Sequence, residues 1–214
     1  MRKIWVIILG TPHRLREPGK QSPDGRLKEC VYGREIVCEL KPKLEAYGLK
    51  VFTDYEPLDL PKDMQTANVD RERERELRMR VDVVNQLCRE YGKENCLYVS
   101  LHCNGSPPND GKWHQPNGWQ VNVGTKAGSQ SKLLAGCLAE AAKDNGLYVR
   151  KPQKSQPYWP QNLYVLNQTA CPAVLTENLF QDNLDDVDFL LSDEGRHVIE
   201  RLHVEGILKY IERK

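Results

Sequence analysis

Short apolar runs alternate along the chain with longer segments in which apolar residues recur every three or four positions. The runs Ile4–Leu9, Leu49–Thr53 and Cys96–Leu101 are apolar enough to predict buried strands. Between them, Glu29–Tyr47 and Asp70–Tyr91 have the spacing of amphipathic helices. This first half therefore predicts the order strand, helix, strand, helix, strand.

The second half of the chain continues the alternation after a loop rich in Pro, Gly and Asn at Ser106–Asn117. It predicts strands at Trp119–Val123, Leu163–Leu166 and Ala173–Thr176, and helices at Ser131–Asn145 and Ser192–Glu212. Alternating strands and helices indicate an α/β domain with a mostly parallel twisted sheet. Because 214 residues suit one domain and no long linker interrupts them, residues 1–214 are expected to form a single domain.

Three local features carry further expectations. Pro42 lies inside the first predicted helix and is expected to kink or split it. The alternating charges at the start of the second helix, Asp70–Glu76, are typical of a solvated face. Ser192 is a suitable N-cap for the last helix.

Composition and charge exclude several classes of protein. The chain is 39% hydrophobic and 29% charged with a net charge of +1, so nothing favours binding to nucleic acid or to an anionic membrane. The apolar run Ile4–Leu9 is too short to cross a membrane or to act as a signal peptide, and no cleavage site follows it. We therefore expect no membrane insertion, and either synthesis in the cytoplasm or a matured secreted fragment.

The seven cysteines are odd in number and lack a C-x-x-C pair, which argues against a disulfide framework and against a cysteine zinc site. Reduced and mostly buried thiols are expected. A Cys103–His102 catalytic pair is disfavoured, because adjacent side chains on a strand point to opposite faces. The chain also contains no G-x-S-x-G elbow, P-loop or dinucleotide-binding fingerprint.

Polar side chains of the kind that bind metals follow three of the predicted strands. His13 and His102 come at the ends of two strands, and Glu177 at the end of a third. In parallel sheets these ends meet at one edge, where the chemistry gathers. A zinc hydrolase needs about three protein ligands, an open position for water and a nearby base. The spacing suits such a site, although histidines at strand ends are also common as structural residues.

The remaining histidines have simpler explanations. His197 and His203 lie on the last predicted helix and are expected to be surface or packing residues. His114 is expected to be an ordinary loop residue, with the lining of a substrate groove as the alternative. On the first helix, the positions alone leave Glu29 and Glu35 equally possible as a carboxylate ligand.

Together the residues resemble the zinc-dependent N-acetylmuramoyl-L-alanine amidases over nearly the whole chain. The resemblance rests on six segments in order: Ile8–His13, Gly25–Glu29, Leu77–Asn85, Ser100–Asn104, Gly118–Val121 and Pro172–Asn183. It implies a three-layer α/β domain with helices on both faces of the sheet. It also implies hydrolysis of the bond between N-acetylmuramic acid and L-alanine, in peptidoglycan or in released muropeptides.

The resemblance also assigns the site. It implies a zinc cofactor held by His13, Glu29 and His102, which favours Glu29 over Glu35, and it implies Glu177 as the catalytic base. The segment between Lys126 and Gln161 is implied to supply part of the substrate groove. Within that segment, Tyr158 and Trp159 are candidates for stacking on substrate or for simple loop packing; no residue is assigned to substrate binding.

Two departures from the family pattern affect the same region. Arg14, Leu15 and Arg16 stand where the family commonly has glycines, so the mouth of the site is expected to differ. Asp54 follows Thr53 where the family usually has arginine.

Two alternative functions stay open on the sequence. A zinc peptidase of related fold uses the same chemistry, since fold does not determine function. A non-catalytic module that binds the cell wall belongs to another class, but it does not need all four site residues. An endolysin released to the wall, a secreted amidase and an enzyme acting on recycled fragments all fit, and the sequence sets no oligomeric state.

Overall fold

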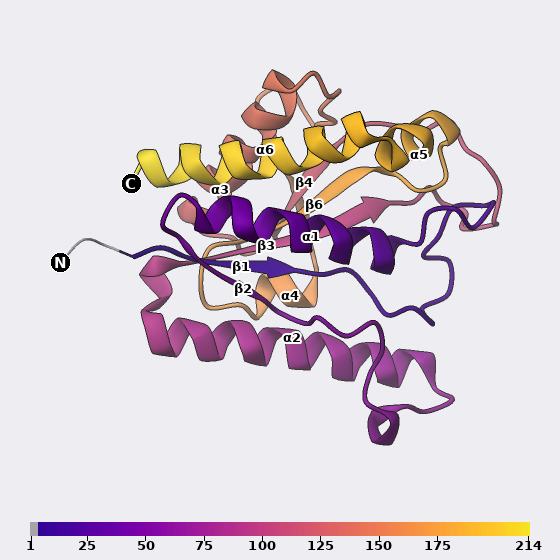
Figure 1. The fold of residues 1–214 in the computed structure, drawn as a ribbon, viewed down its shortest axis with the longest axis horizontal. Helices are drawn as coiled ribbons and strands as arrows, with labels where there is room; N and C mark the ends of the chain where they lie inside the picture. Colours follow the sequence, from indigo (N-terminus) through magenta and orange to yellow (C-terminus); the bar gives the residue numbers. More distant parts are fainter. Residues whose placement is uncertain (1–3) are drawn as a thin grey trace.

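Six strands form one sheet in the order β2-β1-β3-β6-β4-β5 in the computed structural model, which describes residues 4–214 (Figure 1). Their bounds are β1 Val6–Gly10, β2 Lys50–Thr53, β3 Cys96–Asn104, β4 Gln120–Gly124, β5 Trp159–Gln161 and β6 Ala173–Phe180. Strands β2, β1, β3 and β6 are mutually parallel, whereas β4 pairs antiparallel with β6. The mostly parallel sheet is thus confirmed; the first three residues of the expected domain lie outside the described part.

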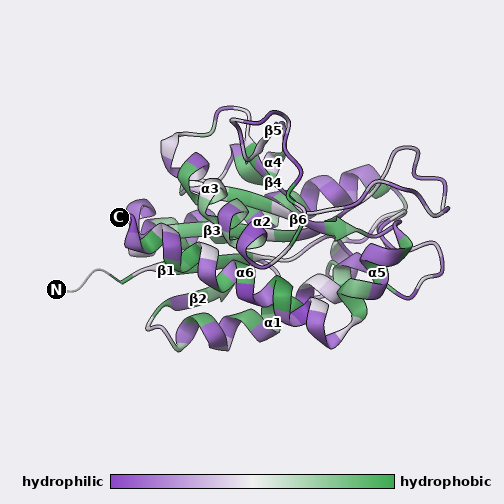
Figure 2. Cartoon of the chain, turned by 90° about the horizontal axis from the view of Figure 1, so that it is seen from above, coloured by the Kyte–Doolittle hydropathy of each residue, from purple (hydrophilic) through white to green (hydrophobic). Residues whose placement is uncertain are grey.

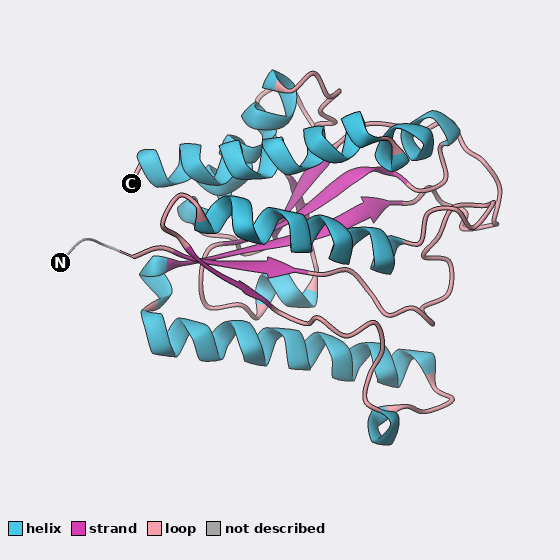
Figure 3. Ribbon diagram, in the orientation of Figure 1, coloured by secondary structure: helices cyan, strands magenta, loops and turns pink. Residues whose placement is uncertain are grey.

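Helices cover both faces of this sheet (Figure 3). One face carries α1 (Glu29–Glu45), α3 (Ser129–Asp144), α5 (Leu184–Leu191) and α6 (Asp193–Glu212), and the other carries α2 (Val69–Tyr91) and α4 (Tyr164–Asn167). Two short 3₁₀ helices, η1 (Lys62–Met64) and η2 (Lys93–Asn95), flank α2 in the sequence. The predicted three-layer arrangement is confirmed.

Alternation along the strands divides the apolar side chains into two cores. On β1, Ile7 and Leu9 join the core beneath α1, α3 and α6, whereas Val6 and Ile8 join the core beneath α2 and α4. All four are fully buried. The strands are accordingly mostly hydrophobic, and hydrophilic residues gather on the helices and loops (Figure 2). This double burial explains why the strands read as continuous apolar runs.

Two of the expected elements differ from the structure. The predicted strand at Leu163–Leu166 is wrong. Tyr164–Asn167 instead forms the one-turn helix α4, which packs against α2. Pro42 does not split α1, which runs unbroken to Glu45. The proline lies in the last turn, and its carbonyl accepts a hydrogen bond from the Ala46 N–H, so the helix still closes normally.

Two short elements, α5 and β5, were not predicted. The expected N-cap of the last helix, α6, is confirmed. The Ser192 hydroxyl accepts a hydrogen bond from the Gly195 N–H at 3.0 Å. Among residues 4–214, no helix is both long and apolar enough to span a membrane.

Candidate metal centre

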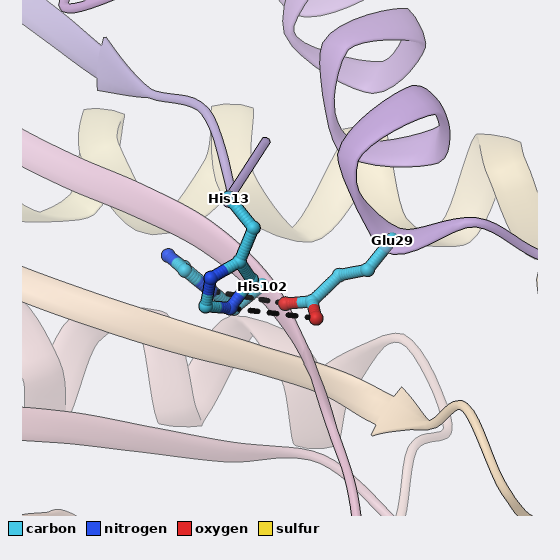
Figure 4. A group of neighbouring side chains, drawn as sticks. All are labelled: His13, Glu29 and His102. Carbon is cyan, nitrogen blue, oxygen red and sulfur yellow. Dashed lines mark hydrogen bonds and ion pairs between the residues drawn. The ribbon is translucent and has the colours of Figure 1, made fainter. Parts of the chain in front are cut away.

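Three elements bring His13, Glu29 and His102 together (Figure 4). His13 lies three residues after β1, His102 lies near the carboxyl end of β3, and Glu29 is the first residue of α1. Because β1 and β3 are adjacent and parallel, their carboxyl ends meet at one edge of the sheet. One nitrogen or oxygen atom from each residue lies within 4.8 Å of the others. His13 and His102 therefore meet at the sheet edge, where their positions after two predicted strands place them.

The Glu29 carboxylate contacts both imidazoles, one through each of its oxygens. Its Oε1 is 3.0 Å from His102 Nδ1 and accepts a hydrogen bond from the Cys103 N–H at 3.1 Å. Its Oε2 is 3.5 Å from His13 Nε2, and it is buried without a hydrogen-bond partner among the described residues. The two imidazole rings are edge to face with centroids 4.9 Å apart. A buried carboxylate oxygen without a hydrogen-bond donor indicates that a ligand from outside the chain binds beside it.

The backbone around His13 is held from several sides. His13 has a φ of +27°, in a region that residues other than glycine seldom adopt. The preceding Pro12 carbonyl accepts a hydrogen bond from the Arg34 guanidinium at 2.7 Å. Gly33 on α1 allows this approach, because a Cβ there would lie 2.4 Å from the Pro12 ring. The strained conformation is thus imposed by packing against α1.

The charges of the group suit a cation. Burial lowers the pKa of His13 well below its ordinary value, although the Glu29 charge opposes this shift, so the imidazole is neutral at pH 7. Burial disfavours ionisation of Glu29, but His13, His102 and Lys20 outweigh it and lower its pKa to about 2. The chain therefore presents a neutral imidazole and a carboxylate beside a second imidazole, a donor set that zinc prefers.

Glu177 on β6 lies opposite His102 in the register between β6 and β3. Beyond this pair the register shifts, and Leu179 has a φ of +64°, as expected for a bulge. Burial, together with the charge on Glu29, raises the pKa of Glu177 to about 8. Asn122 donates a hydrogen bond to the Glu177 carboxylate at 3.4 Å, a contact that the sequence did not suggest.

Two cavities adjoin this group. One, of ≈ 200 Å³, is lined by Glu177 together with all three clustered residues, and by Lys20. The other, of ≈ 180 Å³, touches the two histidines and is lined by charged residues of α2 (Arg73, Glu76 and Arg80) and by apolar side chains that include Leu77, Leu163, Val165 and Leu175. The segment 126–161 contributes no residue to either cavity. The expected contribution of that segment to the groove therefore has no support here, and Tyr158 packs against the core as simple packing predicts.

Three of the residues that depart from the family pattern, Arg14, Arg16 and Asp54, belong to an ion-pair network beside His13, which we call the charge network. Its members are Arg14, Arg16, Glu17, Asp54, Glu72, Arg73, Glu76 and Arg80. Arg16 and Arg73 of this network are exposed, and its other members are buried. Arg14 is only 1% exposed and pairs with Glu17, Glu72 and Glu76. Rather than lining the mouth of the site, it points into the protein.

Burial of these acids corrects one prediction from the sequence. The prediction that the charge run at the start of α2 is a solvated face is wrong for two of its residues, since Glu72 and Glu76 are buried. They face Arg14, which the sequence separates from them by more than fifty residues. Asp54 accepts hydrogen bonds from the Thr11 N–H and from Arg80 at 2.9 and 2.8 Å, which gives the unusual residue after Thr53 a role in holding the loop before His13.

The other candidates from the sequence lie away from the centre. Glu35 pairs with Arg196 on the surface, so only Glu29 reaches the histidines. His197 is exposed, and His203 is buried with both ring nitrogens hydrogen bonded. His114 contacts Asp110 in its loop and is not among the residues lining either cavity.

The thiols match the expectation of buried, unlinked cysteines. All seven are free, and only Cys38 is exposed. Burial, and then the charges of Glu29 and Glu177, raise the pKa of the Cys103 thiol well above its ordinary value. A thiol held in its neutral form supports no role as a nucleophile.

Comparison with known proteins identifies the family. A family model described as N-acetylmuramoyl-L-alanine amidase matches residues 7–209. The chain belongs to this family. An endolysin of Bacillus phage SPP1 is 31% identical over 138 residues, which cover 62% of this chain and 48% of the endolysin. The chain thus spans about half the length of that relative.

Solved amidases share the fold. An N-acetylmuramoyl-L-alanine amidase from Clostridium difficile 630 superposes with a TM-score of 0.79 over 99% of both chains, at 17% identity. The catalytic domain of the amidase CwlV from Bacillus (Paenibacillus) polymyxa gives a TM-score of 0.74 at 19% identity, covering 99% of this chain and 100% of that one. At these identities, the structural likeness establishes the fold alone.

Proposed function

We propose that this chain is a zinc-dependent amidase that hydrolyses the bond between N-acetylmuramic acid and L-alanine in peptidoglycan or released muropeptides. The observation that carries the proposal is the buried Glu29 carboxylate, which contacts both His13 and His102 and has one oxygen lacking a donor. Family membership over residues 7–209 supports the substrate class. The endolysin relative supports action at the cell wall after release.

The chain's own residues divide the chemistry between them. His13, Glu29 and His102 would hold zinc, which when bound supplies Lewis acidity at the scissile carbonyl. Glu177 takes a proton from the attacking water and returns it to the leaving nitrogen of L-alanine. A pKa raised to about 8 lies near neutral pH, so both the ionised form that the first step needs and the protonated form that the second step needs are populated. Asn122 holds the carboxyl through its hydrogen bond.

The test combines substrate, metal and the proposed base. The purified protein should contain one zinc per chain and release peptide from a muramoyl-peptide, but it should not cut a matched peptide lacking the sugar. Glu177→Gln should lower turnover by about two to four orders of magnitude, the usual share of acid–base catalysis, while zinc affinity stays unchanged.

A role for Glu177 in orienting a ligand predicts a different result. Zinc affinity would then fall about 10- to 100-fold, and excess zinc would restore turnover. Such a rescue contradicts the assignment of Glu177 as the base. Full zinc occupancy in a His102→Ala variant contradicts the metal site, and cleavage of the sugar-free peptide indicates a peptidase.

A further inference from the structure

The cavity above the candidate metal centre has one cationic side chain whose purpose the proposed reaction does not explain. Lys20 lines this cavity of ≈ 200 Å³ together with Glu29 and Glu177, and among residues 4–214 it is the only lysine or arginine that does so. Its side chain is half-buried. Its positive charge lowers the pKa of both Glu29 and Glu177. Within residues 4–214, however, no carboxylate lies within ion-pair distance of its ammonium group.

The backbone around Lys20 is fixed, in contrast to its unpaired ammonium group. The Lys20 carbonyl accepts a hydrogen bond from the Glu29 N–H at 3.0 Å. The preceding Gly19 carbonyl accepts one from the buried Gln181 side chain at 2.9 Å. Gln21 and Lys28 form an antiparallel bridge just beyond. The position of Lys20 is therefore set by the same segment that begins α1 and carries Glu29.

Neighbouring amide side chains give this part of the cavity further donors. Asn104 and Asn109 both line it. The Asn109 amide nitrogen packs against Gly19, where a Cβ would lie 1.8 Å away, so only glycine admits the asparagine there. The Asn104 oxygen is used by the Gly105 N–H at 3.0 Å, which leaves its amide nitrogen free to donate. An ammonium group with amide N–H donors beside it is suited to a carboxylate.

The chemistry of the substrate limits which carboxylate this is. The carboxyl group of the muramic acid is consumed in the scissile amide, so the sugar side of that bond carries no charge. The nearest free carboxylate belongs to the peptide, on the residue that follows the L-alanine. Successive Cα atoms are about 3.8 Å apart, so this group remains within reach of a cavity that also contains Glu177.

We propose that Lys20 binds the carboxylate of the residue following L-alanine, and so selects substrates whose peptide carries a free acid at that position. This inference rests on the proposed function. It assigns Lys20 to substrate binding rather than to metal binding or proton transfer.

The experiment uses two soluble substrates that differ only at this group. They are N-acetylmuramoyl-L-alanyl-D-glutamate and its counterpart with the α-carboxylate converted to a carboxamide. In the wild-type protein the KM for the acid should be roughly tenfold lower, as expected for one charge-assisted hydrogen bond that remains partly solvated. Lys20→Met should raise the KM for the acid by a similar factor, leave the KM for the amide unchanged and leave kcat nearly unchanged with both.

Two further variants control the result. Lys20→Arg keeps the charge and should retain most of the preference. Lys112→Met removes a positive charge from a side chain that is 77% exposed and does not line the cavity, so it should change neither KM. Zinc content and thermal unfolding of Lys20→Met should match those of the wild type.

The outcomes separate this inference from the proposed function. A protein that cuts neither substrate contradicts the proposed function itself. A wild-type protein that cuts both with equal KM contradicts only the role of Lys20. A Lys20→Met variant that loses kcat equally with both substrates also contradicts it, because the lysine would then act on the reaction rather than on the peptide carboxylate.

Discussion

Two groups of buried polar side chains meet at the loop after β1, and they differ in how completely the protein supplies their partners. The charge network, which begins at Arg14, combines four arginines with four acids that pair with one another. The metal group, which begins one residue earlier at His13, contains one carboxylate and two histidines, and Glu29 Oε2 has no hydrogen-bond donor. The two groups are adjacent, and both contain a fully buried charged residue, Arg14 in one and Glu29 in the other.

The difference distinguishes residues that stabilise the fold from residues that bind a ligand at this site. Burying a charge is tolerated when the protein provides a partner of opposite charge and good geometry. Every charged group of the charge network has such a partner within the chain, although Arg14 Nε, which lies 3.1 Å from Glu76 Oε2, makes no hydrogen bond. The metal group does not satisfy this condition, so its remaining requirement is met by something from outside the chain. Removing a residue from the first group should therefore affect stability, whereas removing one from the second should affect binding.

The largest effect is expected from Glu29→Gln. Loss of the charged ligand should weaken zinc binding by more than about 100-fold, the upper end of the effect of losing an outer partner of a ligand. The zinc-free variant should unfold within about 1 kcal/mol of the zinc-free wild type, since the amide keeps the size of the side chain and an oxygen for the Cys103 N–H. Competition with a chromophoric chelator and urea unfolding measure the two quantities.

A matched control for Glu29 lies on the same helix. Glu35→Gln removes an acid that is exposed and paired with Arg196, so zinc affinity should not change. If Glu35→Gln lost zinc and Glu29→Gln kept it, the metal group as described here would be wrong.

The next effect concerns Arg14→Met in the charge network. Its loss leaves Glu17, Glu72 and Glu76 buried around an uncharged side chain, which should lower the free energy of unfolding by about 3–5 kcal/mol. Arg78→Met is the control, because Arg78 pairs with Glu74 on the surface, where such pairs contribute about 0.5 kcal/mol or less. Urea unfolding of both zinc-free variants measures the difference.

A conservative change keeps this prediction testable if Arg14→Met does not fold. Arg14→Lys retains the charge but loses the fork that contacts three acids, so it should be destabilised by an intermediate amount. Equal stabilities of Arg14→Met and Arg78→Met would show that the network contributes no more than a surface pair.

The smallest effect concerns His203, whose two ring nitrogens both have hydrogen-bond partners. Its Nδ1 donates to the Ile199 carbonyl at 2.7 Å, and its Nε2 is 2.9 Å from the Thr176 hydroxyl. Burial lowers its pKa to about 4. Between pH 6.5 and about 4 the unfolded chain takes up a proton that the folded chain refuses, so stability falls as the pH falls.

The expected size of this loss is roughly 2 kcal/mol between pH 7 and pH 5, relative to a His203→Gln variant. His197→Gln, which changes an exposed histidine on the same helix, should retain the wild-type pH dependence. Titration of the His203 ring by NMR in the native protein gives an independent value. A pKa near 6.5 would show that complete hydrogen bonding does not keep this histidine neutral.

Much of the site followed from the order of residues along the chain. His13 and His102 follow apolar runs, and parallel strands place such residues at one edge, so their meeting needed only the prediction of a sheet. Glu177 followed by the same rule. The choice of Glu29 over Glu35 did not, since both lie on one helix and only the packing of α1 against the loop after β1 decides which acid reaches the imidazoles.

Among residues 4–214, the sequence by itself determined five of the six strands, most of the helices and the strand-end residues, because apolar periodicity and chain order act locally. Only the tertiary structure decided which charges are buried. Glu72 and Glu76 read as solvated because their partner Arg14 is far away in the sequence. Nothing in the sequence marked Lys20 as a functional residue, because a lysine in a loop is an ordinary surface residue. Only the folded structure shows that Lys20 lines a cavity with two carboxylates and, among residues 4–214, has no ion-pair partner.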